Sequence, residues 1–231
     1  MRSAGGSASR PQRTPATDKT TRARIRDAAI RRFATSGFGA SVRAIAQDAA
    51  VSPGLVMHHF GSKDALRAAC DEHVLAQIRA VKNETIGHAA GGGGFLQAFA
   101  GAQEHAALLG YVLRSMQDGS SLAREFIDRM VDDAVAYTRH AVAQGIVVPS
   151  RDEVARARHL TFSGLGALLL EVTLNPPEDP SDLRAIVDTF LEQSYLPMLE
   201  LYTEGFLTTR RMLDDYLMYV TDPPEGATAA G

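Results

Sequence analysis

Hydrogen-bond donors gather in a short stretch of the N-terminal third of the chain. Arg43 carries a planar guanidinium that can pair with guanine O6 and N7 or with a phosphate, and Lys63 carries a point charge suited to a phosphate. Between them lie His58 and His59, whose ring nitrogens can also donate. These residue types at this spacing indicate contact with a polyanion that offers hydrogen-bond acceptors both on its phosphate backbone and on the edges of its bases.

The sequence around these donors predicts short helices. Ser52 and Pro53 mark the start of a helix of about two turns, because a hydroxyl caps the first free N–H groups and proline has no N–H to leave unbonded. Ser41 marks another short helix, and Ser62 the start of a longer fourth one. Helices this short are unstable alone in water, so they must pack on a longer first helix that begins near Thr20.

Two short helices joined by a tight turn form a helix-turn-helix unit, whose second helix enters the major groove of DNA. Val56 and Phe60 lie four residues apart and form the inward face of that second helix. Leu55 and Met57, off this face, suit contact with thymine methyl groups. We expect DNA contacts from Arg43, Ser52, Gly54, Leu55, Met57, His58, His59 and Lys63.

Charge is distributed unevenly along the chain. Residues 1–70 hold twelve Lys/Arg and four Asp/Glu, a balance of +8, and the remaining residues carry −11. A basic N-terminal part attracts a polyanion, whereas the acidic remainder is repelled by one. A basic tail without a partner would give the same balance, so charge alone leaves both readings open.

Composition excludes several classes of protein. The 231 residues are 45% hydrophobic and 22% charged, which is unlike a disordered chain, a collagen or a coiled-coil rod. Cys70 is the single cysteine, so no intrachain disulfide can form, and no signal peptide or membrane-spanning run is apparent. We expect a cytoplasmic protein without contact to a membrane.

No residue pattern of an enzyme stands out. Cys70 and His73 share a helix face but are too few to close a metal site, and the four glycines from Gly91 follow no strand and precede no lysine. The common hydrolase, zinc and nucleotide motifs are missing. The sequence therefore predicts no catalytic residue, no metal and no cofactor.

The chain beyond the glycines has the pattern of an all-α protein. Helices are predicted near Phe95–Leu109, Ser121–Gln144, Asp152–Leu174, Leu183–Thr203 and Phe206–Tyr219. We expect a disordered basic arm over 1–18, a helix-turn-helix DNA-binding domain over 19–66, a ligand-binding and dimerisation domain over 67–220, and a disordered tail over 221–231.

The run from Ala44 to Gly54, followed by His59 to Leu66, resembles the tetracycline-repressor (TetR) family of bacterial transcriptional regulators. The upstream residues Ala28, Ala29, Phe33 and Gly37 fit the same pattern, and the resemblance covers residues 20–67. The segment from Leu55 to His59 also resembles an actinobacterial branch often sited beside efflux genes. The resemblance implies an all-helical homodimer with an N-terminal three-helix DNA-binding domain and a C-terminal ligand domain.

Three residues depart from the family's usual pattern. Met57 stands where an aromatic residue, mostly tyrosine, is usual, so a hydroxyl-to-phosphate bond is lost. His59 stands where tyrosine is common, and its ring nitrogen can replace the hydroxyl. Ala50 occupies a turn position often filled by glycine, where a positive φ would cost up to ~1 kcal/mol. The departures at Met57 and His59 leave the operator sequence open. The departure at Ala50 leaves the geometry of the turn open.

The resemblance also implies a ligand cavity and a dimer interface in the C-terminal domain. The expected cavity lining is Phe95, Phe99, Tyr111, Met116, Phe126, Met130, Tyr137 and Phe162. The expected dimer contacts are Gly164, Ala167, Leu168, Leu191 and Tyr195. A lipophilic cation would be favoured if Glu104, Glu125 or Glu171 faced the cavity, and an acyl chain is equally open.

The function predicted from these features is a ligand-responsive regulator, a repressor that a small apolar or amphipathic molecule releases from a palindromic operator. Two alternatives remain. One is a sequence-indifferent protein that holds double-stranded DNA by its basic arm. The other is a helical carrier or enzyme with a vestigial DNA module. Specific binding to one operator would rule out the first alternative. Turnover of a bound ligand would support the second.

Overall fold

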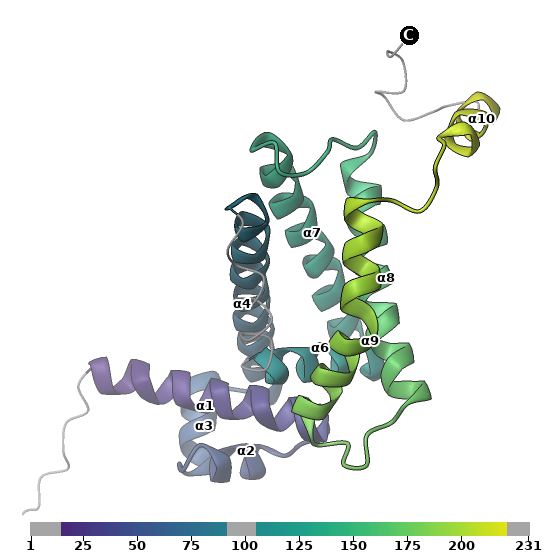
Figure 1. Cartoon of the computed structure of the whole chain (residues 1–231). Helices are drawn as coiled ribbons and strands as arrows, with labels where there is room; N and C mark the ends of the chain where they lie inside the picture. The colour runs from purple at the N-terminus through teal and green to yellow at the C-terminus, as the bar shows by residue number, and fades with distance from the viewer. Residues whose placement is uncertain (1–14, 92–104, 221–231) are drawn as a thin grey trace, which may run out of the picture.

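The computed structural model describes residues 15–91 and 105–220, and all regular structure in these two ranges is helical (Figure 1). None of the helices there is both long enough and apolar enough to cross a bilayer. Their bounds are α1 (Pro15–Ser36), α2 (Val42–Asp48), α3 (Pro53–Phe60), α4 (Lys63–Gly91), α6 (Ala106–Asp118), α7 (Ser121–Ala143), α8 (Glu153–Leu174), α9 (Leu183–Thr203) and α10 (Arg211–Tyr219).

The helices divide into a small group at one end and a bundle above it. In Figure 1, α1 lies across one end of the molecule, with α2 and α3 packed on it, and α4 runs away from them beside α7. α8 packs on α7, and α9 packs on both α8 and α6. The most extensive contact joins α1 to α6, so the two groups share a broad boundary.

One hydrophobic core runs through both groups. It includes Phe33 of α1, Ile45 of α2, Val56 of α3, Leu66 of α4 and Phe126 of α7, all nearly inaccessible to solvent. α4 is continuous across the boundary predicted at residues 66 and 67. The DNA-binding part predicted from the sequence is therefore physically joined to the C-terminal bundle by one helix and one core.

Several helix boundaries differ from those predicted. α1 begins at Pro15 rather than near Thr20, so residues 15–18 of the arm predicted over 1–18 are helical, whereas its residues 1–14 lie outside the described ranges. α10 begins at Arg211 rather than Phe206, after a turn in which Gly205 has φ +77°. The predicted tail over 221–231 also lies outside the described residues.

α6 is the largest correction, because its helix continues to Asp118 where the sequence pattern ended one at Leu109. Gly110 lies inside α6 and faces two neighbouring helices. A Cβ added there would come within 2.6 Å of Leu183 Cδ2 and 3.2 Å of Ala34 Cβ. The glycine therefore permits close packing, whereas glycine within a helix ordinarily weakens it.

The starts of α8 and α9 agree with the prediction to within one residue: α8 begins at Glu153 rather than Asp152, and α9 begins at Leu183 as predicted. Asp152 caps α8 by accepting a hydrogen bond from the Ala155 N–H at 2.8 Å, while Ser150 N–H donates to Glu153 Oε1. α9 is likewise capped by Asp182. In the preceding turn, Asp179 accepts a hydrogen bond from the Ser181 N–H at 2.8 Å.

Candidate DNA-binding surface

α3 is held in place by its two ends and by two buried side chains. Ser52 Oγ accepts from the Leu55 N–H at 3.2 Å, and Gly61, at φ +76°, donates to the Met57 carbonyl at 2.8 Å. Val56 and Phe60 are buried against the neighbouring helices, as the four-residue spacing predicts. The helix is therefore anchored on one face and free to present the other.

α2 is positioned by its cap and by an ion pair to α1. Ser41 Oγ accepts from the Ala44 N–H at 3.2 Å, and Ile45 is buried. Arg32 of α1 donates from Nε and Nη2 to the two carboxylate oxygens of Asp48, each at 2.6 Å. This bidentate pair keeps the pKa of Asp48 below its usual value and fixes the end of α2 that leads into the turn.

The turn between α2 and α3 has the geometry that the sequence left open. Ala50 adopts φ +51°, and within the described residues it alone among non-glycine residues has a positive φ. The Val51 N–H that follows donates to the Ala46 carbonyl at 2.9 Å, which closes the turn. An alanine is therefore strained where glycine would not be.

The residues predicted to meet DNA lie at the surface. Gly54, Met57 and His58 are exposed on α3, and Leu55 and His59 are partly exposed beside them. The remaining three surround α3 in the fold: Ser52 is exposed at its cap, Arg43 is exposed in the first turn of α2, and Lys63 is partly exposed at the start of α4. The structure thus places all eight on or next to the open side of this small helical group.

The basic residues of α1 divide into two kinds. Arg32 is engaged by Asp48, and Arg26 donates to Asp27 at 2.7 and 2.9 Å, so both are neutralised locally. The others are exposed, and Arg22 also lies 4.6 Å from the ring centroid of Phe60. The exposed set is Lys19, Arg22, Arg24 and Arg31. These four residues form the basic patch of α1, which is therefore smaller than the six basic residues of the helix suggest.

Comparison with known proteins agrees with this arrangement. Residues 25–70 match the model described as bacterial regulatory proteins of the tetR family, and residues 103–208 match the tetracyclin repressor-like C-terminal domain. The HTH-type transcriptional regulatory protein RaaS of Mycobacterium tuberculosis is 44% identical over 200 residues, which cover 87% of this chain and 93% of RaaS. The chain belongs to the TetR family. It is a helix-turn-helix transcriptional regulator, and this family is not one of enzymes.

Solved structures of TetR-family regulators share the fold. One from Mesorhizobium loti is 19% identical with a TM-score of 0.50, covering 78% of this chain and 98% of that one. One from a Rhodococcus species is 21% identical with a TM-score of 0.53, covering 74% of this chain and 98% of that one.

A second relative matches by sequence over a shorter stretch. The UidR regulator of Escherichia coli is 45% identical over 64 residues, which cover 26% of this chain and 33% of UidR.

A buried polar contact joins α4 to α6 behind the DNA-binding surface of this TetR-family chain. Tyr111 is fully buried, and its hydroxyl donates to Asp71 Oδ1 at 2.6 Å. Burial raises the pKa of Asp71, and the hydrogen bond from Tyr111 partly opposes that rise. The ring of Tyr111 also packs edge-on to Phe38 and Phe126, with centroids 5.2 and 5.8 Å away.

Two arginines extend this junction along the C-terminal half of α6. Arg67 of α4 is buried, donates to Asp118 Oδ2 at 3.0 Å, and lies 3.6 Å from the ring centroid of Phe38. Ser120 also donates to Asp118, and the two donors lower the pKa of that carboxyl. Arg114 of α6 donates to the carbonyls of Ala34 and Thr35, the last turn of α1, at 3.3 and 3.1 Å.

The sequence predicted none of these junction contacts, and it assigned Tyr111 to the ligand cavity instead. The spacing of residues along the fourth helix predicts one inward side that carries Leu66, Ala69, His73, Ala76 and Gln77. The structure instead buries Leu66, Arg67, Cys70, Asp71, Val74 and Leu75. The available signal was Arg67 and Asp71, two charged residues one turn apart on an otherwise apolar face.

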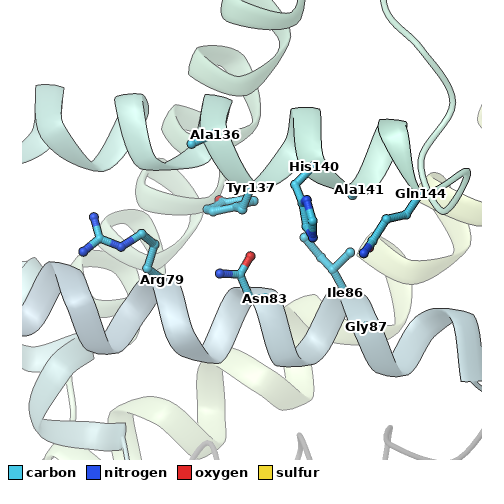
Figure 2. A pocket seen from close by; sticks show the side chains of 9 residues that line it. All are labelled: Arg79, Asn83, Ile86, Gly87, Ala136, Tyr137, His140, Ala141 and Gln144. Carbon is cyan, nitrogen blue, oxygen red and sulfur yellow. The ribbon is translucent and has the colours of Figure 1, made fainter.

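A cavity of about 470 Å³ lies between α4 and α7 (Figure 2). The side chains that line it from α4 include Arg79, Asn83 and Ile86, and those from α7 include Tyr137 and His140. Gly87, Ala136, Ala141 and Gln144 complete the lining. Arg79 Nη1 also donates to Asp133 at 2.6 Å, so its guanidinium is held at one end of the cavity.

Only part of the predicted cavity lining is found there. Tyr137 lines the cavity, but Tyr111, Phe126 and Met130 are buried in the hydrophobic core, because they face neighbouring helices that the sequence pattern does not reveal. Met116 packs at the edge of that core. Phe162 is exposed, with Arg158 4.5 Å from its ring centroid. Phe95, Phe99 and Glu104 lie outside the described residues.

The predicted dimer residues are mostly accessible. Gly164 and Ala167 are exposed on α8, and Leu191 and Tyr195 are partly exposed on α9. Leu168 is a correction: it is only 2% exposed, because it turns into the subunit and has little surface to offer a partner. Other large apolar residues of these helices are exposed instead, namely Leu160, Phe162, Leu170, Leu174, Leu196, Leu201 and Tyr202.

Proposed function

We propose that this regulator is a cytoplasmic homodimeric repressor that binds a palindromic operator through α3 and leaves it when a small molecule occupies the cavity between α4 and α7. Residues 19–66 would contact DNA, and residues 67–220 would bind the ligand and the second subunit. The observation that carries the proposal is the open face of α3, bounded by exposed Arg43 and partly exposed Lys63.

Each DNA contact follows from the position of its side chain. Lys63 begins α4, where the helix dipole and free N–H groups already favour a phosphate, so it would fix the position of the duplex. Met57 and His58, exposed on α3, would meet base edges, and Arg43 would reach a base or the backbone. The exposed arginines of α1 would add affinity that does not depend on sequence.

The cavity favours an amphipathic ligand that is neutral or negatively charged. Tyr137 and Ile86 offer apolar surface, whereas Arg79, Asn83, His140 and Gln144 bring hydrogen-bond donors. None of its nine lining residues is a carboxylate, and the nearby carboxylate of Asp133 is already paired with Arg79, so a lipophilic cation finds no free counter-ion in this lining. Its volume lies within the range of about 300–1,000 Å³ typical of small-molecule sites.

Fluorescence anisotropy with the DNA that flanks the gene tests DNA recognition. Arg43→Ala and Lys63→Ala are compared with Arg139→Ala, which removes the same charge from an exposed site on α7. Lys63→Ala should weaken binding to all sequences and lower the salt slope by about 1, while Arg43→Ala should also narrow the gap between operator and scrambled DNA. Equal, strongly salt-dependent binding to both DNAs would favour the sequence-indifferent alternative.

A matched pair of amphiphiles tests the cavity. Decanoate and decyltrimethylammonium have alkyl chains of the same length and opposite charge. Decanoate should release the operator at lower concentration, and the double variant Arg79→Met, His140→Ala should abolish that preference, with each protein's release measured relative to its own operator affinity in the absence of amphiphile. Tighter binding of the cation would contradict the proposed ligand class.

A further inference from the structure

α10 carries a row of exposed apolar side chains and extends away from the helical bundle in Figure 1. Met212, Tyr216 and Tyr219 are 70%, 64% and 87% exposed, and their spacing of four and three residues places them on one helix face. Asp214 lies on the opposite face, and Asp215 lies at the edge of the apolar face. α10 does not pack extensively on any other described helix.

The apolar surface is too large to be incidental. Phe206 and Leu207, which precede α10, are also exposed, and so is Leu213. Phe206, Tyr216 and Tyr219 each carry an aromatic side chain of roughly 150–250 Å². Together these three side chains reach the size of the largest apolar patch on a typical monomer, about 300–600 Å². A surface of this kind marks an interaction site.

This surface is continuous with the exposed face of α9. Leu196, Leu201 and Tyr202 are exposed on the last turns of α9, and the chain passes directly from them to Phe206. The family's C-terminal domain model ends at residue 208, so α10 lies beyond the matched region. α10 therefore follows the matched domain and is attached at the edge of the proposed dimer face.

We propose that α10 is an arm that docks on a second copy of this chain, where it covers the end of α8 and α9 remote from the DNA-binding surface. The inference rests on the homodimer proposed above. α10 alone is too small for a stable interface, which needs about 800 Å² per partner, so it would add to the contact made by α8 and α9.

The fold limits where the arm can reach. Residues 204–210 connect α9 to α10, and at about 3.5 Å per residue they span at most ~25 Å. Both DNA-binding surfaces of a dimer must face one duplex, so its twofold axis runs from that end of the bundle to the other. The ends of the two α9 helices would then lie on the same side, where exposed Val148 and Val154, at the start of the partner's α8, are the surface we propose for the arm.

Photo-crosslinking of the full chain tests the arm. Tyr219→Cys is labelled with a benzophenone maleimide, and Met218→Cys, exposed on the other face of α10, is the matched control. Cys70 gives little background, because it is buried. Irradiated Tyr219→Cys should yield covalent dimers with adducts on the second chain's α8 or α9, at several times the yield of Met218→Cys.

Other results would overturn the inference in distinguishable ways. A protein that sediments as a monomer removes both the homodimer and the arm. A dimer whose label attaches only within its own chain, or to nothing, removes the arm and leaves the homodimer intact.

A second measurement concerns affinity. Met212→Glu with Tyr216→Glu should raise the dimer dissociation constant about tenfold or more, since two large apolar side chains would lose their burial. Met218→Glu should change it far less. Equal dissociation constants for the double variant and the wild type would contradict the arm.

Discussion

Replacing Tyr111 by phenylalanine should destabilise the chain by about 1.5–3 kcal/mol. The substitution removes one hydroxyl and keeps the ring packing on Phe38 and Phe126. The lost bond is short, 2.6 Å to Asp71 Oδ1, and both side chains are buried, so water cannot replace it. A carboxyl left without its donor in such a place costs more than the bond itself contributes in water.

Thermal unfolding at one fixed protein concentration measures this effect, because a dimer's midpoint depends on concentration. For a chain of this size the expected fall is about 3–12 °C. Tyr137→Phe is the control: it deletes the same group from a half-buried tyrosine whose hydroxyl has no hydrogen-bond partner among the described residues. A fall for Tyr111→Phe no larger than for Tyr137→Phe would refute the reasoning, as would a double-mutant cycle with Asp71→Asn that gives no coupling energy.

Three further outcomes are expected. Ala50→Gly should stabilise the chain by up to ~1 kcal/mol in urea unfolding, because the φ of +51° suits glycine, and a loss of stability would contradict the strain. Cys70 should react with a disulfide reagent at pH 8 only after unfolding, since burial raises the pKa of its thiol to about 12; fast reaction of the native protein would show that the thiol is accessible. Burial raises the pKa of Asp71 in the folded state, so the folded chain binds a proton at this carboxyl more tightly than the unfolded chain does. The stability of the wild type relative to Asp71→Asn should therefore rise as pH falls from 7 through the folded pKa and level off below about 4, and a flat difference would contradict the burial cost.

Local signals predicted the DNA-binding helices well. Ser41, Ser52 and Ser62 each accept a hydrogen bond from a backbone N–H three residues on, as their positions before apolar runs suggested. Such caps act within one helical turn and can therefore be read from neighbouring residues. The positive φ at Ala50 was likewise a local consequence of a tight turn.

Contacts between distant segments explain what the sequence could not show. Gly110 is packed against Leu183, which only the folded chain brings near, and the helix around it was cut short in prediction. Tyr111 and Phe126 have the spacing of cavity residues and of core residues alike, and only the packing of the folded helices decides that they belong to the core. The partners in the junction lie 40 to 80 residues apart, beyond the reach of any helical periodicity.

The junction explains how a ligand could act on the DNA-binding surface under the proposed function. α4 begins with Lys63 at that surface, is tied to α6 through Arg67 and Asp71, and lines the cavity with Arg79 and Asn83 further along. α6 in turn holds the end of α1 through Arg114. A molecule that moves α4 away from α7 must either break the buried bonds of the junction or carry α6 and α1 along with it. Moving α6 and α1 together with α4 costs less free energy than breaking the junction, because a single buried charge-assisted hydrogen bond is worth about 1.5–3 kcal/mol. Ligand and operator would then oppose one another reciprocally, since each binds best to a different position of the same connected helices.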